Sequence, residues 1–161
     1  MSIITMKRFW ITKEYIELEE SDNSDYKLIV IDNVDLLNKH IEEIKILIDY
    51  FNMQYKWKEM FSINDVGDRI INNNTLFLLY YKNQPVGYTW IKEINNEIGY
   101  IFNVYVTKII ERPKTISKWF INKLFHYNLK KYSKIKLEVE DWNWSAINLF
   151  LSVGTQEIKF I

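Results

Sequence analysis

The residues best suited to chemistry lie in one stretch, Tyr100 to Phe125. The sequence predicts an apolar strand over Tyr100-Ile-Phe-Asn-Val-Tyr-Val106, then a polar turn, then an amphipathic helix from about Thr115. The turn carries Arg112 and Lys114. Backbone N–H groups in the first turn of a helix have no acceptor within the helix, so this junction suits an anion such as a phosphate.

Composition excludes several other kinds of site. The chain has 161 residues, which favours one domain, with 21 basic and 21 acidic side chains and no cysteine. The balanced charge argues against a nucleic-acid-binding protein, and the missing thiols exclude disulfides, thiolate metal ligands and a cysteine nucleophile. Two histidines, His40 and His126, are too few for a histidine-rich metal site, so no metal is expected. Without a signal-peptide pattern or a run of about 18 apolar residues, we expect a cytoplasmic protein outside the membrane.

The remaining elements follow from periodicity and turn signals. Apolar and aromatic positions in residues 3–20 predict one or two strands. Asp35 can cap a helix that frays near Phe51, and a second helical segment should cover about 56–72, broken or kinked around Gly67. The other predicted elements are strands at 27–31, 75–82, 86–94, 97–106, 134–140 and 157–161, and helices at 115–131 and 144–152. The strand, helix and strand at 97–140 should pair in parallel through a right-handed crossover.

Three segments of the sequence carry a family resemblance: Gln84-Pro-Val-Gly-Tyr88; the strand 100–106 with Arg112-Pro-Lys-Thr-Ile-Ser117; and Leu137-Glu-Val139 with Trp142, Asn143, Ala146, Leu149, Phe150 and Gly154. Together with the element order, they resemble the GNAT superfamily of N-acetyltransferases over residues 26–161. The spacing of the third segment is most similar to the diamine and polyamine acetyltransferases of that superfamily.

The resemblance implies a binding site for acetyl-CoA as co-substrate. The backbone of Val104 and Val106 would pair with the pantetheine arm. The pyrophosphate would bind the backbone of the turn and first helical residues, with charge from its basic side chains; the residues involved would be Arg112, Lys114, Thr115, Ile116, Ser117 and Lys118. Asn143 and Phe150 would also lie at the cofactor site, and Asn103 would be the catalytic candidate.

The sequence departs from the family pattern at three places. Thr115 and Ser117 stand where the pyrophosphate loop usually has glycines, which let phosphate approach the backbone. Phe102 and Asn103 replace the carboxylates of polyamine-type members, and Phe150 replaces the tyrosine that commonly protonates the departing thiolate. Purely structural interpretations stay open: helix caps at Thr115, Ser117 and Asn143, a buried polar side chain at Asn103, and a core side chain at Phe150.

The sequence therefore predicts an α/β fold with a mixed, mostly antiparallel central sheet, splayed in the middle, with helices on both faces. Residues 1–25 would form an N-terminal extension that adds a strand, and residues 26–161 one GNAT-like domain. The expected function is acetyl-CoA-dependent N-acetyl transfer to a small amine or an amino terminus. The alternative is a catalytically impaired module that binds CoA or a protein partner without turnover. A homodimer through aromatic surface also stays open.

Overall fold

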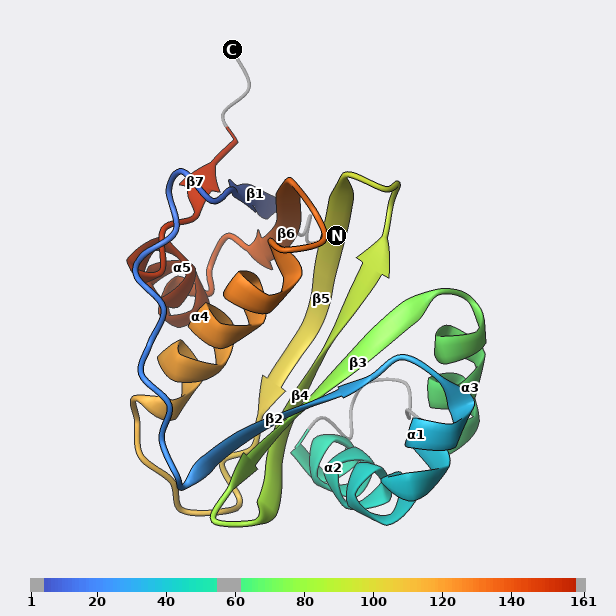
Figure 1. Ribbon diagram of the computed structural model, residues 1–161. Helices are drawn as coiled ribbons and strands as arrows, with labels where there is room; N and C mark the ends of the chain where they lie inside the picture. The colour runs from blue at the N-terminus through green and yellow to red at the C-terminus, as the bar shows by residue number, and fades with distance from the viewer. Residues whose placement is uncertain (1–4, 55–61, 159–161) are drawn as a thin grey trace. The chain divides into compact units, whose positions relative to one another are not determined.

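The computed structural model describes residues 5–54 and 62–158, which form seven strands and five helices (Figure 1). In chain order the elements are β1 (Met6–Ile11), β2 (Tyr26–Ile31), α1 (Val34–Lys39), α2 (Ile41–Gln54), α3 (Ile63–Ile71), β3 (Asn74–Tyr81), β4 (Gln84–Glu93), β5 (Ile98–Val106), α4 (Ile116–Asn128), β6 (Lys134–Glu140), α5 (Trp144–Ser152) and β7 (Gln156–Glu157). No helix among these residues is long and apolar enough to cross a membrane.

The strands form one mixed sheet with the order β2-β3-β4-β5-β6-β1-β7. β5 and β6 pair in parallel, whereas β2–β3, β3–β4, β1–β6 and β1–β7 pair antiparallel. This confirms the predicted α/β class and the mostly antiparallel sheet. The parallel register runs from Ile98↔Lys134 to Ile101↔Leu137, although β5 continues to Val106 and β6 to Glu140.

The chain divides into two compact units, which are treated separately below. Unit 1 holds the described residues up to Ser21, then Glu93–Phe102, and those from Lys114 onward. Unit 2 holds Asp22–Lys92 and Asn103–Pro113. The predicted division at residue 25 stays a prediction.

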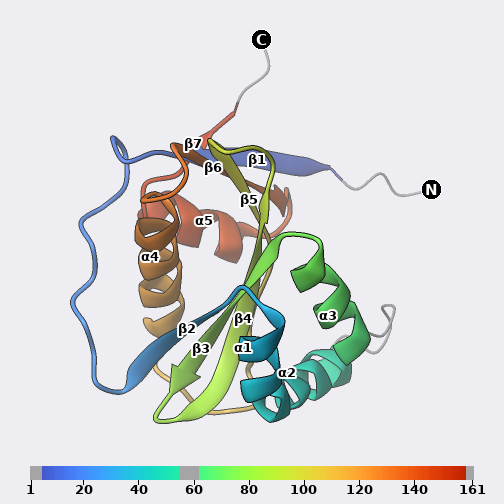
Figure 2. The ribbon, with the colours of Figure 1, turned by 45° about the vertical axis from the view of Figure 1, so that its right-hand side comes forward.

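In unit 2, three helices pack beside β2, β3 and β4 (Figure 2). Leu76 and Leu78 of β3 lie two residues apart on one face of the sheet and share a small apolar cavity with Tyr88 and Trp90 of β4. The helices close this cavity with four apolar side chains, Ile44, Leu47, Ile48 and Val66. The single helix expected up to about Phe51 is two helices, and both contribute core residues, Leu37 from α1 and Ile44 and Ile48 from α2.

Two expectations about these helices are wrong. Asn33, not Asp35, caps α1, because the Asn33 side chain accepts a hydrogen bond from the Leu36 amide at 2.9 Å. α1 also ends at Lys39, before α2 begins. α3 runs through Gly67 without a break, starting from a capping box between Ser62 and Asp65. The part of the predicted second helix that falls on 56–61 lies outside the described residues.

The burial of Tyr80 in β3 should make the free energy of unfolding depend on pH. Tyr80 is 6% exposed, and its hydroxyl has no hydrogen-bond partner among the described residues. Burial, and then the charge of Glu43, raise the pKa of Tyr80 from 10.0 to about 12. Because the folded protein holds this proton more tightly, the stabilisation is complete below pH 10 and is lost between pH 10 and 12.

Replacing Tyr80 with phenylalanine should therefore make the free energy of unfolding depend less on pH in this range. The wild-type free energy of unfolding should fall about 2 kcal/mol further than that of Tyr80→Phe between pH 10 and pH 12. Urea denaturation of both proteins at the two pH values measures the difference. Parallel curves would mean that Tyr80 titrates like an exposed tyrosine.

In unit 1, β1 lies between β6 and β7 (Figures 1 and 2). Its register with β6 runs from Met6↔Glu140 to Ile11↔Ile135. Phe9 and Ile11 are buried on the same face as Leu137 of β6, and residues 12–18 belong to no strand. The strand expected near residues 8–18 thus occupies Met6–Ile11.

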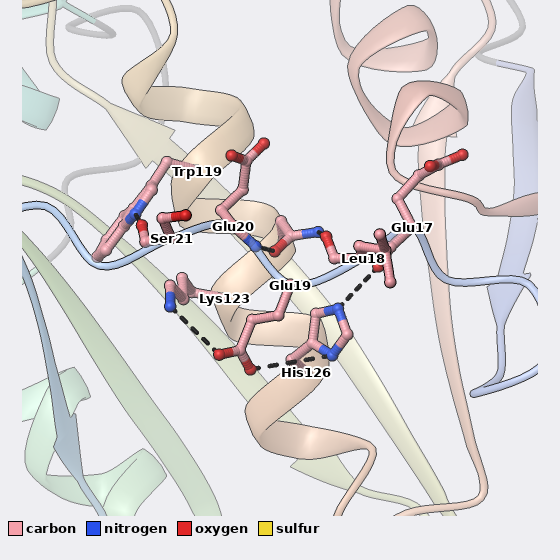
Figure 3. A network of polar contacts seen from close by, with 9 residues as sticks. Glu17, Leu18, Glu19, Glu20, Ser21, Trp119, Lys123 and His126 are labelled. Atoms are coloured by element: carbon pink, nitrogen blue, oxygen red, sulfur yellow. Dashed lines mark hydrogen bonds and ion pairs between the residues drawn. The ribbon is translucent and has the colours of Figure 1, made fainter.

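After β1, the chain runs extended along α4, where it is held mainly through its backbone (Figure 3). Asn122 makes two of these contacts: its side-chain oxygen accepts from the Glu20 amide at 2.8 Å, and its side-chain nitrogen donates to the Leu18 carbonyl at 3.1 Å. Trp119 Nε1 donates to the Ser21 carbonyl at 3.0 Å. We call residues 15–21 the strap.

Charged groups add to the strap contacts. Lys123 Nζ lies 3.3 Å from a carboxylate oxygen of Glu19. His126 Nε2 lies 2.8 Å from the Glu17 carbonyl, and since a carbonyl only accepts, the ring nitrogen donates. His126 is thereby explained as a structural residue. At the other side of the strap, the Glu17 amide donates to the Val153 carbonyl at the end of α5, 3.1 Å away.

Candidate active site

The site predicted from sequence begins where β5 passes Asn103. This residue has φ +55°, a left-handed backbone that asparagine tolerates better than most residues. Its side chain is exposed, so the expectation of a buried polar residue is wrong. A left-handed residue inside a strand changes the direction in which the following residues present their groups.

Past Asn103, a hydrogen bond between β5 and β4 shows which amides of β5 point toward β4 and which point away. The Thr107 amide donates to the Val86 carbonyl of β4 at 2.7 Å. Successive residues of a strand direct their amides to alternate edges, so Val104 and Val106 direct theirs away from β4. Both valines also lie beyond Ile101, the last β5 residue in register with β6.

Gly87 explains how β4 comes so close to this part of β5. A Cβ at Gly87 would lie 2.6 Å from the Tyr105 carbonyl oxygen and 3.3 Å from the Val106 Cα. No side chain fits there without moving the backbone. This glycine belongs to the segment Gln84–Tyr88 of the sequence pattern, and its role is close strand packing.

A chain of polar contacts follows the end of β5. Thr107 Oγ1 donates to Gln54 Oε1 of α2 at 3.3 Å and accepts from the Ile109 amide at 3.1 Å; the Tyr105 hydroxyl also donates to Gln54 Oε1. Arg112 Nε donates to the Thr107 carbonyl at 2.8 Å. The turn that carries Arg112 is therefore fastened to β5 and, through Gln54, to α2.

Arg112 sits in a partly desolvated position. Burial lowers the pKa of Arg112, and the nearby Tyr105 opposes this shift. Because the ordinary pKa of arginine lies far above neutrality, the guanidinium stays charged at neutral pH. With Nε used by the Thr107 carbonyl, the position of the charge is set by the backbone of the turn.

At the start of α4, the structure decides between two interpretations of Thr115. Thr115 is the N-cap, but its side chain makes no capping hydrogen bond, so the capping interpretation is wrong. The amides of Ile116, Ser117 and Lys118 occupy the first turn, where the helix offers no acceptor. Lys114, Thr115 and Lys118 are exposed and Ser117 is half-buried, whereas the Ile116 side chain is fully buried. Ile116 can thus offer a ligand only its backbone.

The two remaining predicted residues have structural roles in unit 1. Asn143 caps α5, because its side-chain oxygen accepts from the Ala146 amide at 3.2 Å. Phe150 is 4% exposed, and its ring centroid lies 6.4 Å from that of Phe125. Phe150 therefore contributes to the core and offers no proton.

The predicted residues fall into two groups. Asn103, Val104, Val106 and Arg112 belong to unit 2, and 114–118, Asn143 and Phe150 to unit 1. The polar partners Gln54, Tyr105 and Thr107 were not foreseen. Gln54 lies 51 residues from Tyr105 in the sequence, and no local pattern connects them.

Comparisons with known proteins concern the family and the fold of the chain. The model of the Acetyltransferase (GNAT) family matches residues 41–154, which include β5, the turn and α4. No curated protein matches the sequence. The solved structures that are similar share 10–17% sequence identity with this chain and therefore speak for the fold alone.

Three of these structures illustrate the range. A conserved protein of unknown function from Staphylococcus epidermidis has a TM-score of 0.62 at 16% identity, covering 95% of this chain and 57% of its own. A GCN5-related N-acetyltransferase from Kribbella flavida has a TM-score of 0.60 at 10% identity, covering 96% of this chain and 55% of its own. An aminoglycoside acetyltransferase from an uncultured soil metagenomic sample, in complex with sisomicin, has a TM-score of 0.56 at 17% identity. The match covers 85% of this chain and 95% of that enzyme.

This chain thus spans little more than half the length of the first similar structures and almost the whole length of the aminoglycoside enzyme. The family match covers well over half of the sequence and includes the strand, turn and helix on which the candidate site was built. The chain belongs to the GNAT family of acetyltransferases.

Proposed function

We propose that the protein is an acetyl-CoA-dependent N-acetyltransferase that moves acetyl directly to a small amine or an amino terminus. The observation that carries the proposal is the edge of β5 past Asn103. There the amides of Val104 and Val106 point away from β4, at positions beyond the register with β6. Such an edge accepts an extended amide-bearing arm by the hydrogen bonding that joins strands.

Each part of the cofactor has a place in this proposal. The pantetheine arm pairs with the backbone of Val104 and Val106. The pyrophosphate takes hydrogen bonds from the first-turn amides of α4, Ile116 to Lys118, where the helix dipole also favours negative charge. Arg112 and Lys114 supply positive charge, and the hydroxyls of Thr115 and Ser117 donate where a glycine loop would offer only backbone.

The thioester supplies an activated acyl group, and the amine nitrogen forms the new bond to the carbonyl carbon as the carbon–sulfur bond breaks. The nitrogen gives up one proton to solvent and the departing thiolate takes one up, so that CoA leaves as the free thiol. Because the sequence has no cysteine, no thiol carries the acetyl group in between. Asn103 cannot act as a base at neutral pH and Phe150 cannot act as an acid. The amine must therefore arrive neutral, Asn103 serves to orient it, and positioning provides most of the rate.

Two hints say which acceptors to screen first. The spacing around Trp142 and Asn143 suggests diamines and polyamines, and the aminoglycoside enzyme with sisomicin suggests amine-bearing sugars. Both classes belong in an acceptor screen. A cytoplasmic location and a homodimer are compatible with the proposal, and sedimentation would measure the oligomeric state.

A second candidate is a module that binds CoA or a protein partner without turnover. The buried Phe150 favours it, because the position expected to hold a proton donor is core. Turnover of acetyl-CoA in the presence of an amine panel separates the two functions.

Titration calorimetry with acetyl-CoA tests the cofactor site. We expect one-to-one binding, about tenfold weaker in Arg112→Ala and about threefold weaker in Thr115→Ala, since hydrogen bonds to charged groups contribute more than neutral ones. Lys130→Ala, an exposed lysine beyond the other end of α4, is the matched control and should bind like the wild type. Binding unaffected by the first two changes would move the pyrophosphate elsewhere. No binding to the wild type would refute the acetyltransferase.

A further inference from the structure

Unit 1 contains a cavity of about 370 Å³, a size that suits a small molecule. Residues of three strands line it, Arg8 and Phe9 of β1, Tyr100 of β5, and Lys136, Leu137 and Glu138 of β6, together with Ile158. None of these residues was among the expected cofactor residues.

The strand registers explain why the polar side chains meet. Tyr100 pairs with Lys136, and Arg8 pairs with Glu138, so the four residues occupy two neighbouring rows of the sheet. Lys136 and Glu138 lie two residues apart on β6 and thus share a face. The alternate residues Ile135 and Val139 are buried on the opposite face.

The cavity contains both signs of charge side by side. Arg8 Nε lies 3.4 Å from a Glu138 carboxylate oxygen, and the two side chains are 51% and 35% exposed. Exposed pairs of this kind contribute little to stability, so a ligand can separate them at small cost. The pKa of Tyr100 is raised, mainly by burial and also by Glu138, while Arg8 opposes the shift, which places all three groups within electrostatic reach.

Two of the residues that line the cavity, Phe9 and Tyr100, are aromatic. The rings of Tyr100 and Phe102 are stacked, with centroids 6.0 Å apart and planes 15° apart. Tyr100 stands on the same strand as Val104, four residues earlier. Aromatic rings favour both apolar chains and ammonium groups.

We propose that this cavity binds the acceptor of acetyl transfer, and that the acceptor is a zwitterion whose ammonium group faces Glu138 and whose carboxylate faces Arg8 and Lys136. This inference rests on the proposed function and names its substrate class. In the complex the ammonium faces Glu138 and the carboxylate lies between Arg8 and Lys136, so each charge of the ligand meets the opposite charge. A diamine would place its second ammonium against Arg8 and Lys136, which costs binding energy.

A matched five-carbon series tests the charge requirement. All four compounds have five carbons and at least one amine. Pentylamine has no second charged group, and cadaverine has a second ammonium group. The two zwitterions each have a carboxylate, which is at the far end of the chain in δ-aminovalerate and beside the amine in norvaline. Ligand-observed NMR titration gives the affinities whether or not turnover occurs, and thiol release from acetyl-CoA gives kcat/KM. At least one of the two zwitterions should exceed cadaverine by about tenfold, which corresponds to about 1.4 kcal/mol.

Variants locate the effect. Arg8→Gln and Lys136→Gln should each weaken the preferred zwitterion severalfold and leave pentylamine unchanged, while Glu138→Gln should weaken every amine. Lys134→Gln is the matched control, because Lys134 lies two residues from Lys136 on β6 but contacts the Trp10 ring, 4.9 Å away, instead of the cavity. Lys136→Gln also tests the idea if the change in β1 impairs folding.

The outcomes are distinguishable. Tighter binding or faster turnover of cadaverine, a zwitterion preference that survives Arg8→Gln and Lys136→Gln, or no binding of any member of the series would overturn the inference. The acetyltransferase itself depends on the separate acetyl-CoA titration. Cofactor binding with a different acceptor would leave the proposed function standing and remove only the zwitterion.

Discussion

Replacing Gly154 with alanine is expected to lower the free energy of unfolding by about 3 kcal/mol or more. Gly154 follows α5 with φ +109°, a backbone conformation that side chains disfavour. An added Cβ would also lie 2.2 Å from the Tyr15 carbonyl oxygen and 3.0 Å from the Ile16 Cα. Both obstacles are backbone atoms of the strap, which cannot turn aside as a flexible side chain would.

Gly67→Ala provides a control of opposite sign. Gly67 lies inside α3, and an added Cβ would be 4.0 Å from its nearest neighbour, a Leu37 methyl carbon, which is ordinary contact. Alanine should therefore stabilise the protein by about 0.5–1 kcal/mol. Urea denaturation of the two variants measures both changes. A Gly154→Ala protein as stable as the wild type would mean that the strap does not pass Gly154 as described.

Replacing Asn122 with leucine is expected to cost about 3 kcal/mol, the second large effect. Asn122 is 1% exposed and satisfies two backbone groups of the strap at once. Leucine has a similar size but leaves the Glu20 amide and the Leu18 carbonyl without this partner. Hydrogen exchange should show the loss locally, as faster exchange of the Glu20 amide.

Asn128→Leu is the matched control for this change. Asn128 lies in the same helix and is 3% exposed, but its side chain donates only within that helix, to the Leu124 carbonyl at 2.8 Å. Its replacement should cost about 1 kcal/mol and leave the exchange of Glu20 unchanged. Equal losses in the two variants would contradict the role given to the strap.

Local patterns predicted most elements of this fold well. The hairpin of β3 and β4 follows from a continuous apolar run, a turn at Asn83 and a second run, and α5 follows from Asn143 before it and Gly154 after it. Errors arose where two local signals compete. Asn33 and Asp35 are both good caps, and only the observed hydrogen bond to Leu36 decides between them. A break at Gly67 is wrong because the capping box at Ser62 and the apolar face of α3 outweigh the cost of a glycine inside a helix.

The site was less predictable because it depends on contacts far apart in the sequence. The order of strand, turn and helix located 103–118, but not the left-handed backbone at Asn103 or the link from Gln54 to Tyr105. The mixed-charge cavity was beyond sequence reasoning, since Arg8 meets Glu138 only through the pairing of β1 with β6. Periodicity predicts that a strand exists, whereas its neighbours in the sheet are set by the whole chain.

The place of β1 in the sheet has a consequence for biosynthesis. Protein chains emerge from the ribosome in order, and of the seven described strands β1 is the first to appear. Both of its partners, β6 at 134–140 and β7 at 156–157, are the last. Until they are made, β1 exposes an apolar face that carries Phe9 and Ile11, and its pairing must then close a loop of more than a hundred residues. The place of β1, sixth in the order of the sheet, is therefore filled only after almost all of the described chain has been translated, and until then the nascent chain has to keep this strand soluble.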